Sequence, residues 1–386
     1  MKSLLKFPLL VAVATMMSCS FSACSDNDDP TPDTGTSETD AKFEAIAKQY
    51  LDHTVYVTYK NLADETEQLV KDLQALKSSK TDANVKATCE TFLEARAWWE
   101  KSEAFLYGAA TDFGIDPHID SWPLDLDGLQ TALKNTEQVE AMGGEDGDIY
   151  AGEKLGNSLL GFHGIEYILF EDGSPKSVSK ISDLHLTYAV AVAGDLRNRC
   201  WQLELSWRGE SAVNADRVAK VANELELPYT VNSGEYSYGE NMLNAGKAGS
   251  TYASWTLAMQ AIADEVGTSK IGKPYSGEDP AYIESPYSHK SILDFYDNII
   301  SIQNAYMGGI ENERDETNSL HNYIAGVDKE LDTKVVNAIN NALTKINAMA
   351  APFVNNIKDP SAGEAIKACQ DLDAILSDVK TALRNN

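Results

Sequence analysis

The chain has 386 residues, with 59 acidic and 32 basic side chains and a formal net charge of −27. This balance disfavours a nucleic-acid-binding protein, because neutralising phosphates takes clustered lysine and arginine and the sequence contains no basic run. Hydrophobic residues make up 43% of the chain and charged residues 24%, which is ordinary for a globular protein whose length fits about two domains.

The first 23 residues have the order of a secretory signal peptide. Lys2 and Lys6 precede an apolar run over residues 7–17, and a stretch of small residues ends at Ala23. The apolar run is too short to span a bilayer, so we expect residues 1–23 to be removed on export.

A cysteine follows this segment directly. The residues Phe-Ser-Ala-Cys at 21–24 resemble a bacterial lipoprotein processing box, with Cys19 as the competing site. We therefore expect Cys24 to be the lipidated first residue of the mature protein. Residues 24–40 then form a disordered tether, since they are rich in Asp, Thr, Pro and Ser. The expected location is the outer membrane, on its periplasmic face or the cell surface, held by the lipid alone.

Three cysteines remain in the body of the chain, at Cys89, Cys200 and Cys369. Their wide spacing excludes a zinc knuckle and a haem-attachment motif. An odd number allows one disulfide at most, and three buried free thiols are favoured over a Cys89–Cys200 bridge.

From residue 41 onward, apolar residues recur with the helical period of 3.6 rather than the strand period of 2. The prediction is an all-α protein made of two helical-bundle halves. A break near residues 207–209 divides it into an N-terminal bundle, 41–209, and a C-terminal bundle, 210–386. We expect long helices near 41–78, 83–108, 153–170, 180–207, 240–267, 289–308, 330–352 and 361–385, and irregular segments at 109–127, 140–152 and 268–288.

Ionisable residues interrupt the apolar stripes of two predicted helices. Arg96 and Glu103 share a stripe with Phe92 and Trp99. Glu166 occupies the centre of another stripe, with His163 about 60° around the same helix. A buried carboxylate must be paired, protonated or metal-bound. Without a metal, Glu166 needs Arg96 or His163 as its charge partner. The alternative interpretation is that the four residues form a buried ion network whose role is to fix the helix register.

His163 and Glu166 are also a tentative metal-ligand pair, because positions i and i+3 share one helix face. A His-Glu-x-x-His motif is absent, and an inverted zinc motif would require histidine where the chain has Tyr167. The Glu-x-x-His pair of di-iron bundles occurs only once and reversed. Among the other histidines, His118 and His289 are the only candidates for additional ligands.

Several segments together resemble the imelysin family. They are residues 95–103, residues 119–123, the Gly-x-His-x-x-Glu segment at 161–166, and a downstream stretch from Glu284 to Gly308. The resemblance implies two helical bundle-like halves, export, a link to iron uptake, and a pocket between the halves. Some members of the family were classed as metallopeptidases.

The resemblance also implies a set of pocket residues. It places Arg96, Glu103, Asp120, Trp122, His163 and Glu166 around the pocket, and Ser288 approaches from the second half. The chain departs from several members at residues 287–291, where they carry a Ser-Asp-Asn-Thr-like stretch. Asp294 and Asn298 lie off the apolar stripe of their helix, so they are either solvated or face the other bundle.

Three functions follow as alternatives. The first is a lipoprotein that binds iron or an iron-bearing ligand in the pocket, since oxygen and imidazole donors suit such ions. The second is a zinc-dependent metallopeptidase. The third is a non-catalytic helical module that interacts with another component of a transport system.

Overall fold

The protein is described here from a computed structural model, which covers residues 38–244, 248–315 and 317–384. The predicted signal peptide, Cys24 and most of the predicted tether lie outside the described residues. Within them, the prediction of an all-α protein is confirmed, because the strands amount to one hairpin of two residues each, β1 (Phe170–Glu171) and β2 (Ser174–Pro175).

The first half of the chain, up to residue 209, contains three long helices and several short ones. Its helices are α1 (Glu38–Tyr50), α2 (Tyr56–Ser78), α3 (Asp82–Glu100), α4 (Ala109–Asp112), α5 (Asp116–Ile119), α6 (Leu126–Lys134), α7 (Thr136–Met142), α8 (Gly147–Lys154), α9 (Gly161–Leu169) and α10 (Asp183–Arg208). A π-helical turn, Leu51–Val55, joins α1 to α2.

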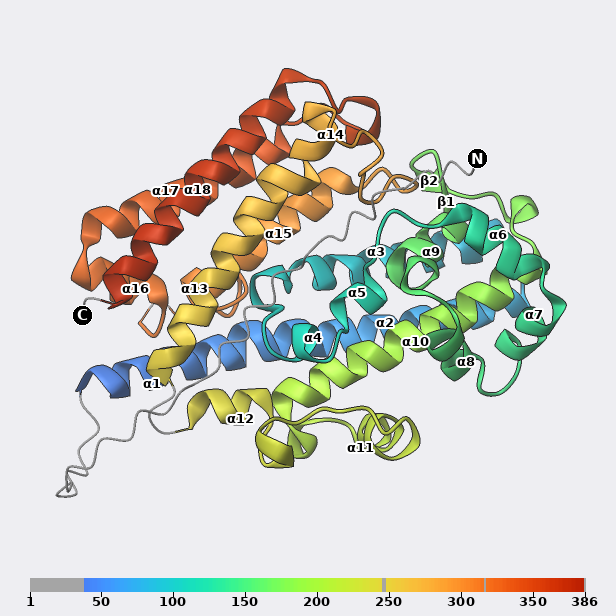
Figure 1. Cartoon of the computed structure of the whole chain (residues 1–386), viewed down its shortest axis with the longest axis horizontal. Helices are drawn as coiled ribbons and strands as arrows, with labels where there is room; N and C mark the ends of the chain where they lie inside the picture. The colour runs from blue at the N-terminus through green and yellow to red at the C-terminus, as the bar shows by residue number, and fades with distance from the viewer. Residues whose placement is uncertain (1–37, 245–247, 316, 385–386) are drawn as a thin grey trace, which may run out of the picture. The chain divides into compact units, whose positions relative to one another are not determined.

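The second half contains the remaining helices of the described chain. They are α11 (Ala215–Val218), α12 (Tyr238–Leu243), α13 (Ala248–Asp264), α14 (Gly272–Ser276), α15 (Ser291–Met307), α16 (Leu320–Val327), α17 (Lys329–Asn347) and α18 (Pro360–Arg384). In Figure 1, α17 and α18 lie side by side in orange and red, and α13 packs along α18. The division into two bundles at residue 209 stays a prediction.

Local sequence explains where the long helices begin. Thr81 caps α3, with its hydroxyl oxygen accepting a hydrogen bond from the backbone N–H of Asn84. Ser182 and His185 form a capping box at the start of α10. Such caps satisfy backbone N–H groups that have no partner inside the helix.

Two predicted helices are shorter in the structure. The helix expected over 83–108 ends at Glu100, so Glu103 lies in a separate 3₁₀ turn, Glu103–Phe105. The helix expected over 153–170 is divided into α8 and α9. The physical reason is Gly161, whose φ of +69° is incompatible with a right-handed helix arriving from residues 155–160.

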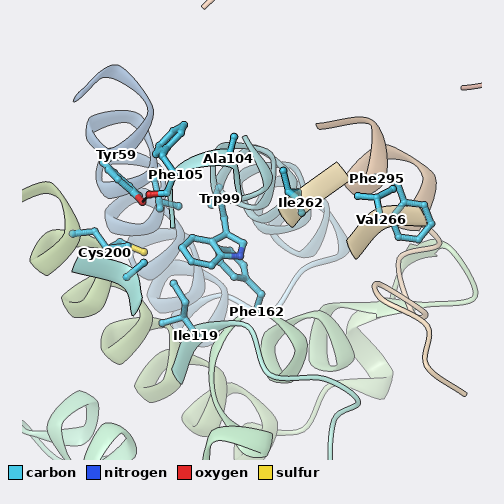
Figure 2. Close-up of a cluster of buried hydrophobic side chains, with 14 of the residues drawn as sticks. Tyr59, Trp99, Ala104, Phe105, Ile119, Phe162, Cys200, Ile262, Val266 and Phe295 are labelled. Carbon is cyan, nitrogen blue, oxygen red and sulfur yellow. Dashed lines mark hydrogen bonds between the residues drawn. The ribbon is translucent and has the colours of Figure 1, made fainter. Parts of the chain in front are cut away.

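One hydrophobic core runs through both halves of the described chain. Figure 2 shows part of it, with Tyr59, Phe105 and Cys200 on one side of Trp99 and with Val266 and Phe295 on the other. Because α3 and α15 pack directly against each other, polar groups on these two helices meet inside the protein.

The cysteines of the described residues are free and buried, at Cys89, Cys200 and Cys369. Burial raises the pKa of the Cys89 and Cys369 thiols to about 12, which makes them unreactive. Among the residues that the structure covers, none of the helices is both long enough and apolar enough to cross a membrane.

Candidate functional site

The Gly-x-His-x-x-Glu segment forms α9, and both of its glycines are required for close packing. A Cβ on Gly161 would lie 1.8 Å from the backbone oxygen of Ile119, and one on Gly164 would lie 2.1 Å from the hydroxyl of Tyr188. The close approach at Gly161 brings Asp120, which follows α5, against the first turn of α9. This is the turn that carries His163.

Arg96 is the centre of the buried site. Its guanidinium is 2% exposed and forms ion pairs with three carboxylates, those of Glu100, Asp120 and Glu284. Nη2 lies 2.5 Å from Glu100 Oε1 and 2.6 Å from Glu284 Oε1. Asp120 also accepts a hydrogen bond from the indole N–H of Trp99, at 2.7 Å. Burial alone would raise the pKa of Asp120, but Arg96 and His163 outweigh it and hold that pKa below its usual range.

A second buried cation, Lys270, completes the pairing. Its ammonium lies 3.2 Å from Glu284, 3.6 Å from Glu100 and 3.7 Å from Glu103. Glu100, Lys270 and Glu284 were missed as site residues by the sequence analysis. Glu100 had a signal, since it stands four residues after Arg96 on the same helix face. Lys270 and Glu284 lie in the stretch 268–288, which is predicted to be irregular because its sequence shows no periodicity that indicates burial. In the structure, Lys270 ends a π-helical turn, Glu265–Lys270.

His163 lies between Asp120 and Glu166. Its Nε2 is 3.1 Å from Asp120 Oδ1, and its Nδ1 is 3.8 Å from Glu166 Oε2. Burial lowers the pKa of His163, but the two carboxylates more than offset this effect and raise the pKa to about 9. His163, rather than Arg96, is therefore the charge partner nearest to Glu166.

Glu166 contacts the second half through one oxygen. Its Oε1 accepts hydrogen bonds from the Tyr287 N–H at 3.2 Å, the Ser288 N–H at 2.8 Å and the Ser288 hydroxyl at 2.7 Å. Ser288, expected from the family resemblance to approach from the second half, thus meets Glu166. Glu166 Oε2 lacks a hydrogen bond from any described residue.

Carboxylates outnumber cations in this interior. The buried acids are Glu100, Glu103, Asp120, Glu166, Glu284 and Asp294, and the buried cationic groups are Arg96, Lys270 and His163. Burial raises the pKa of Glu100 and Glu103, and it raises that of Asp294 to about 7. An interior with surplus acids must hold protons or take up a cation.

Asp294 and Asn298, for which solvation was one expectation, are buried on α15 and face the first half. Asn298 donates a hydrogen bond to Glu100 Oε2 at 2.5 Å. Its Oδ1 and Asp294 Oδ2 have no hydrogen-bond partner among the residues described. The off-stripe positions are buried because α15 packs against α3 as well as against α13 and α17. Its polar face, which carries Asn298, lies toward α3.

Three of these side chains could hold a metal ion. Asp120, His163 and Glu284 each offer a ligand atom, and these atoms lie within 4.8 Å of one another. One imidazole and two carboxylates suit iron or zinc. Glu284 Oε2 has no hydrogen-bond partner in the described chain, which leaves a buried oxygen available. Glu166, half of the ligand pair suggested by spacing, does not belong to this set.

A pocket of about 260 Å³ reaches the site from the surface, between residues of the two halves. The carboxylates of Glu103, Asp116, Asp120 and Glu265 line it, together with the rings of Trp122 and Tyr282. The Trp122 ring lies 5.9 Å from the His163 ring and 5.1 Å from the Tyr282 ring. Asp120 is therefore both a wall of the pocket and a member of the metal-ligand set.

The other candidate histidines do not join the site. His118 Nε2 lies 2.7 Å from Asp195 Oδ2. His289 faces Asp172, at 3.7 Å.

The chain is similar to known proteins in sequence and in fold. The chain is 27% identical to the iron-regulated protein A of Synechococcus elongatus over 337 residues, which cover 85% of this chain and 82% of that protein. A crystal structure from Parabacteroides distasonis, described as an iron-regulated protein A precursor, matches with a TM-score of 0.74 and 27% identity. This match covers 91% of this chain and 97% of that one.

A crystal structure of an imelysin-like protein from Psychrobacter arcticum matches with a TM-score of 0.63 and 11% identity, over 87% of this chain and 93% of that one. At this identity the match concerns the fold alone. The family model Peptidase_M75, described as Imelysin, matches residues 55–379. Because that match covers most of the sequence, the chain belongs to the imelysin family.

Proposed function

We propose that this protein is an exported, iron-related binding protein that takes up a metal ion between Asp120, His163 and Glu284. The observation that carries the proposal is the convergence of these three buried donors, from three separate segments, beside a pocket lined by acids. The surplus of buried carboxylates supports it, because a bound cation compensates charge that otherwise requires protons.

Arg96 must give up its contacts with Asp120 and Glu284 when such an ion binds, because it pairs with both carboxylates in the metal-free protein. Glu100 makes this exchange possible, since it lies one helical turn from Arg96 and pairs with the same guanidinium. When a metal binds Asp120 and Glu284, Arg96 keeps a buried charge partner. His163 must release a proton to ligate through Nε2, so metal affinity rises with pH.

The names of the relatives point to iron as the metal to test first. Iron-regulated protein A, by its name, responds to iron, and it aligns with most of this chain. One imidazole with two carboxylates is also a donor set that iron accepts.

Thermal unfolding of metal-depleted protein tests the proposal. Fe²⁺, Fe³⁺ or Zn²⁺ at about 100 times its Kd should stabilise the parent by about 2.7 kcal/mol. His163→Ala and Asp120→Asn should lose this gain. His118→Ala, which removes a histidine outside the site, should keep it. A parent that no metal stabilises would contradict the proposal and favour an iron-bearing ligand or a protein partner from a transport system.

A second assay separates the metallopeptidase alternative. The protein is incubated with a peptide mixture, with and without chelator. Cleavage that the chelator and His163→Ala both abolish would favour a zinc-dependent enzyme over a binding protein.

We also propose that export ends with a lipid on Cys24, which anchors the protein to the outer membrane. The support is the order of charged, apolar and small residues before Cys24. Cys24→Ala should release the protein from the membrane fraction, and Cys19→Ala should not. The opposite pattern would make Cys19 the lipidated residue.

A further inference from the structure

We propose that Glu166 is a positioning residue of the metal site rather than one of its ligands. Its role is to hold residues 284–289 of the second half so that Glu284 reaches Asp120 and His163. This inference rests on the proposed function. It concerns which of the motif's two ionisable residues contacts the metal.

Hydrogen bonding occupies the oxygen of Glu166 that faces the second half. Three donors converge on Oε1, at 2.7 to 3.2 Å, and all belong to Tyr287 and Ser288. Hydrogen bonds to an ionised carboxylate are about twice as strong as neutral ones. An oxygen with three such donors has little capacity left for a metal ion.

The 284–289 segment needs this support. Ser285, the second residue of the segment, and His289, its last, have φ values of +50° and +59°, a backbone conformation that non-glycine residues seldom adopt. Between them, the Tyr287 carbonyl accepts a hydrogen bond from the Gly173 N–H at 2.9 Å. The Tyr287 ring also packs edge-on against Tyr167 of α9, with centroids 5.2 Å apart. Glu166 supplies the charged part of this attachment.

Glu284 lies at the beginning of the same segment, three residues before the first amide that Glu166 binds. If the amides of Tyr287 and Ser288 detach, the segment keeps only the Tyr167 ring contact as its described link to α9, while Arg96 and Lys270 still pair with the Glu284 carboxylate. The backbone that carries Glu284 is then less firmly held against α9, and metal binding must restore its position beside His163. Glu166 therefore acts on the metal through residues 287 and 288.

The second oxygen of Glu166 acts on His163 from the side away from Asp120. Oε2 lies 3.8 Å from Nδ1, whereas Nε2 faces Asp120. A carboxylate on this side favours a proton on Nδ1 and leaves Nε2 free for a metal ion. Both oxygens thus position other groups.

Hydrogen exchange in metal-free protein tests the attachment without any metal. Glu166→Ala should speed exchange in peptides covering residues 284–289 by about tenfold, because the amides lose their acceptor. Glu166→Gln keeps an acceptor oxygen and should change it little. Ser288→Ala removes one of the three donors to Glu166. It is the milder variant and serves as the test if Glu166→Ala fails to fold. It should give an intermediate increase. Glu153→Ala, an exposed acid on α8, is the matched control. Unchanged exchange in both Glu166→Ala and Ser288→Ala would overturn the inference.

Cobalt binding then separates positioning from ligation. With Co²⁺ as the spectroscopic probe, Glu166→Gln should bind with nearly the parent's affinity and give the parent's absorption spectrum at saturation. Glu166→Ala should bind about tenfold more weakly yet reach the same spectrum. A changed saturated spectrum in Glu166→Gln would make Glu166 a ligand and overturn the inference. A parent that binds neither Co²⁺ nor iron would instead refute the proposed function, and the exchange result would still report whether Glu166 holds the segment.

Discussion

Removing the charge of Arg96 should destabilise the metal-free protein more than any surface substitution. Arg96→Met keeps an unbranched side chain but leaves Glu100, Asp120 and Glu284 without their guanidinium. Removing one partner of a buried ion pair costs about 3–5 kcal/mol. Lys270 still lies 3.2 Å from Glu284 and 3.6 Å from Glu100, which limits the loss. Asp120 keeps His163 at 3.1 Å as its closest remaining cation, with Lys270 acting from farther away, so we expect a cost near the upper end, about 5 kcal/mol.

The cost should depend on pH in a defined direction. Without Arg96, the pKa values of Glu100 and Asp120 rise above their unfolded values, because burial then acts with less compensation. A native state with raised carboxyl pKa values binds more protons than the unfolded state and gains stability as the pH falls. The difference between parent and variant should therefore shrink by about 1 kcal/mol or more between pH 7 and pH 5.

Urea unfolding with chelator present measures both quantities. Arg208→Met is the matched control, since it removes an arginine whose partner Glu204 keeps Arg217 at 2.7 Å; it should cost about 1 kcal/mol or less. Adding Asp120→Asn to Arg96→Met should recover part of the loss, since a neutral amide needs no cation. A cost for Arg96→Met below about 1 kcal/mol, or one that grows as the pH falls, would refute the reasoning.

Three further predictions concern the motif helix and the thiols. Gly161→Ala should cost about 3 kcal/mol or more, since its Cβ would meet the Ile119 carbonyl at a φ of +69°; the control Gly156→Ala, with open space around it, should change thermal stability little. The metal-free parent should lose about 3 kcal/mol of stability as the pH rises from 6.5 through 9, because the pKa of His163 is raised to about 9 in the folded state. His163→Asn should not show this loss. Identical profiles of stability against pH for the parent and His163→Asn would contradict the prediction. The cysteines of the body should not react with a thiol reagent until the protein unfolds, whereas rapid labelling of the native protein would show that they are accessible.

The sequence alone determined the helical architecture, because helix formation is a local property with a period that the side chains display. The buried positions of Arg96 and Glu166 were also predictable, since each interrupts an apolar stripe on a helix, and His163 lies close to the stripe of Glu166. The break within the helix predicted over 153–170 was not found, because it depends on the approach of Ile119 to Gly161.

Tertiary structure decided which charges meet. Arg96 and Glu284 are 188 residues apart, and Lys270 and Glu284 come from a segment without periodicity, so no local pattern predicts their burial. The pairing follows from the packing of α15 against α3, which encloses more carboxylates than cations. The role of Glu166 was decided in the same way. Spacing placed it beside His163 on α9, but the backbone of residues 287 and 288 reaches its carboxylate only when the two halves pack together.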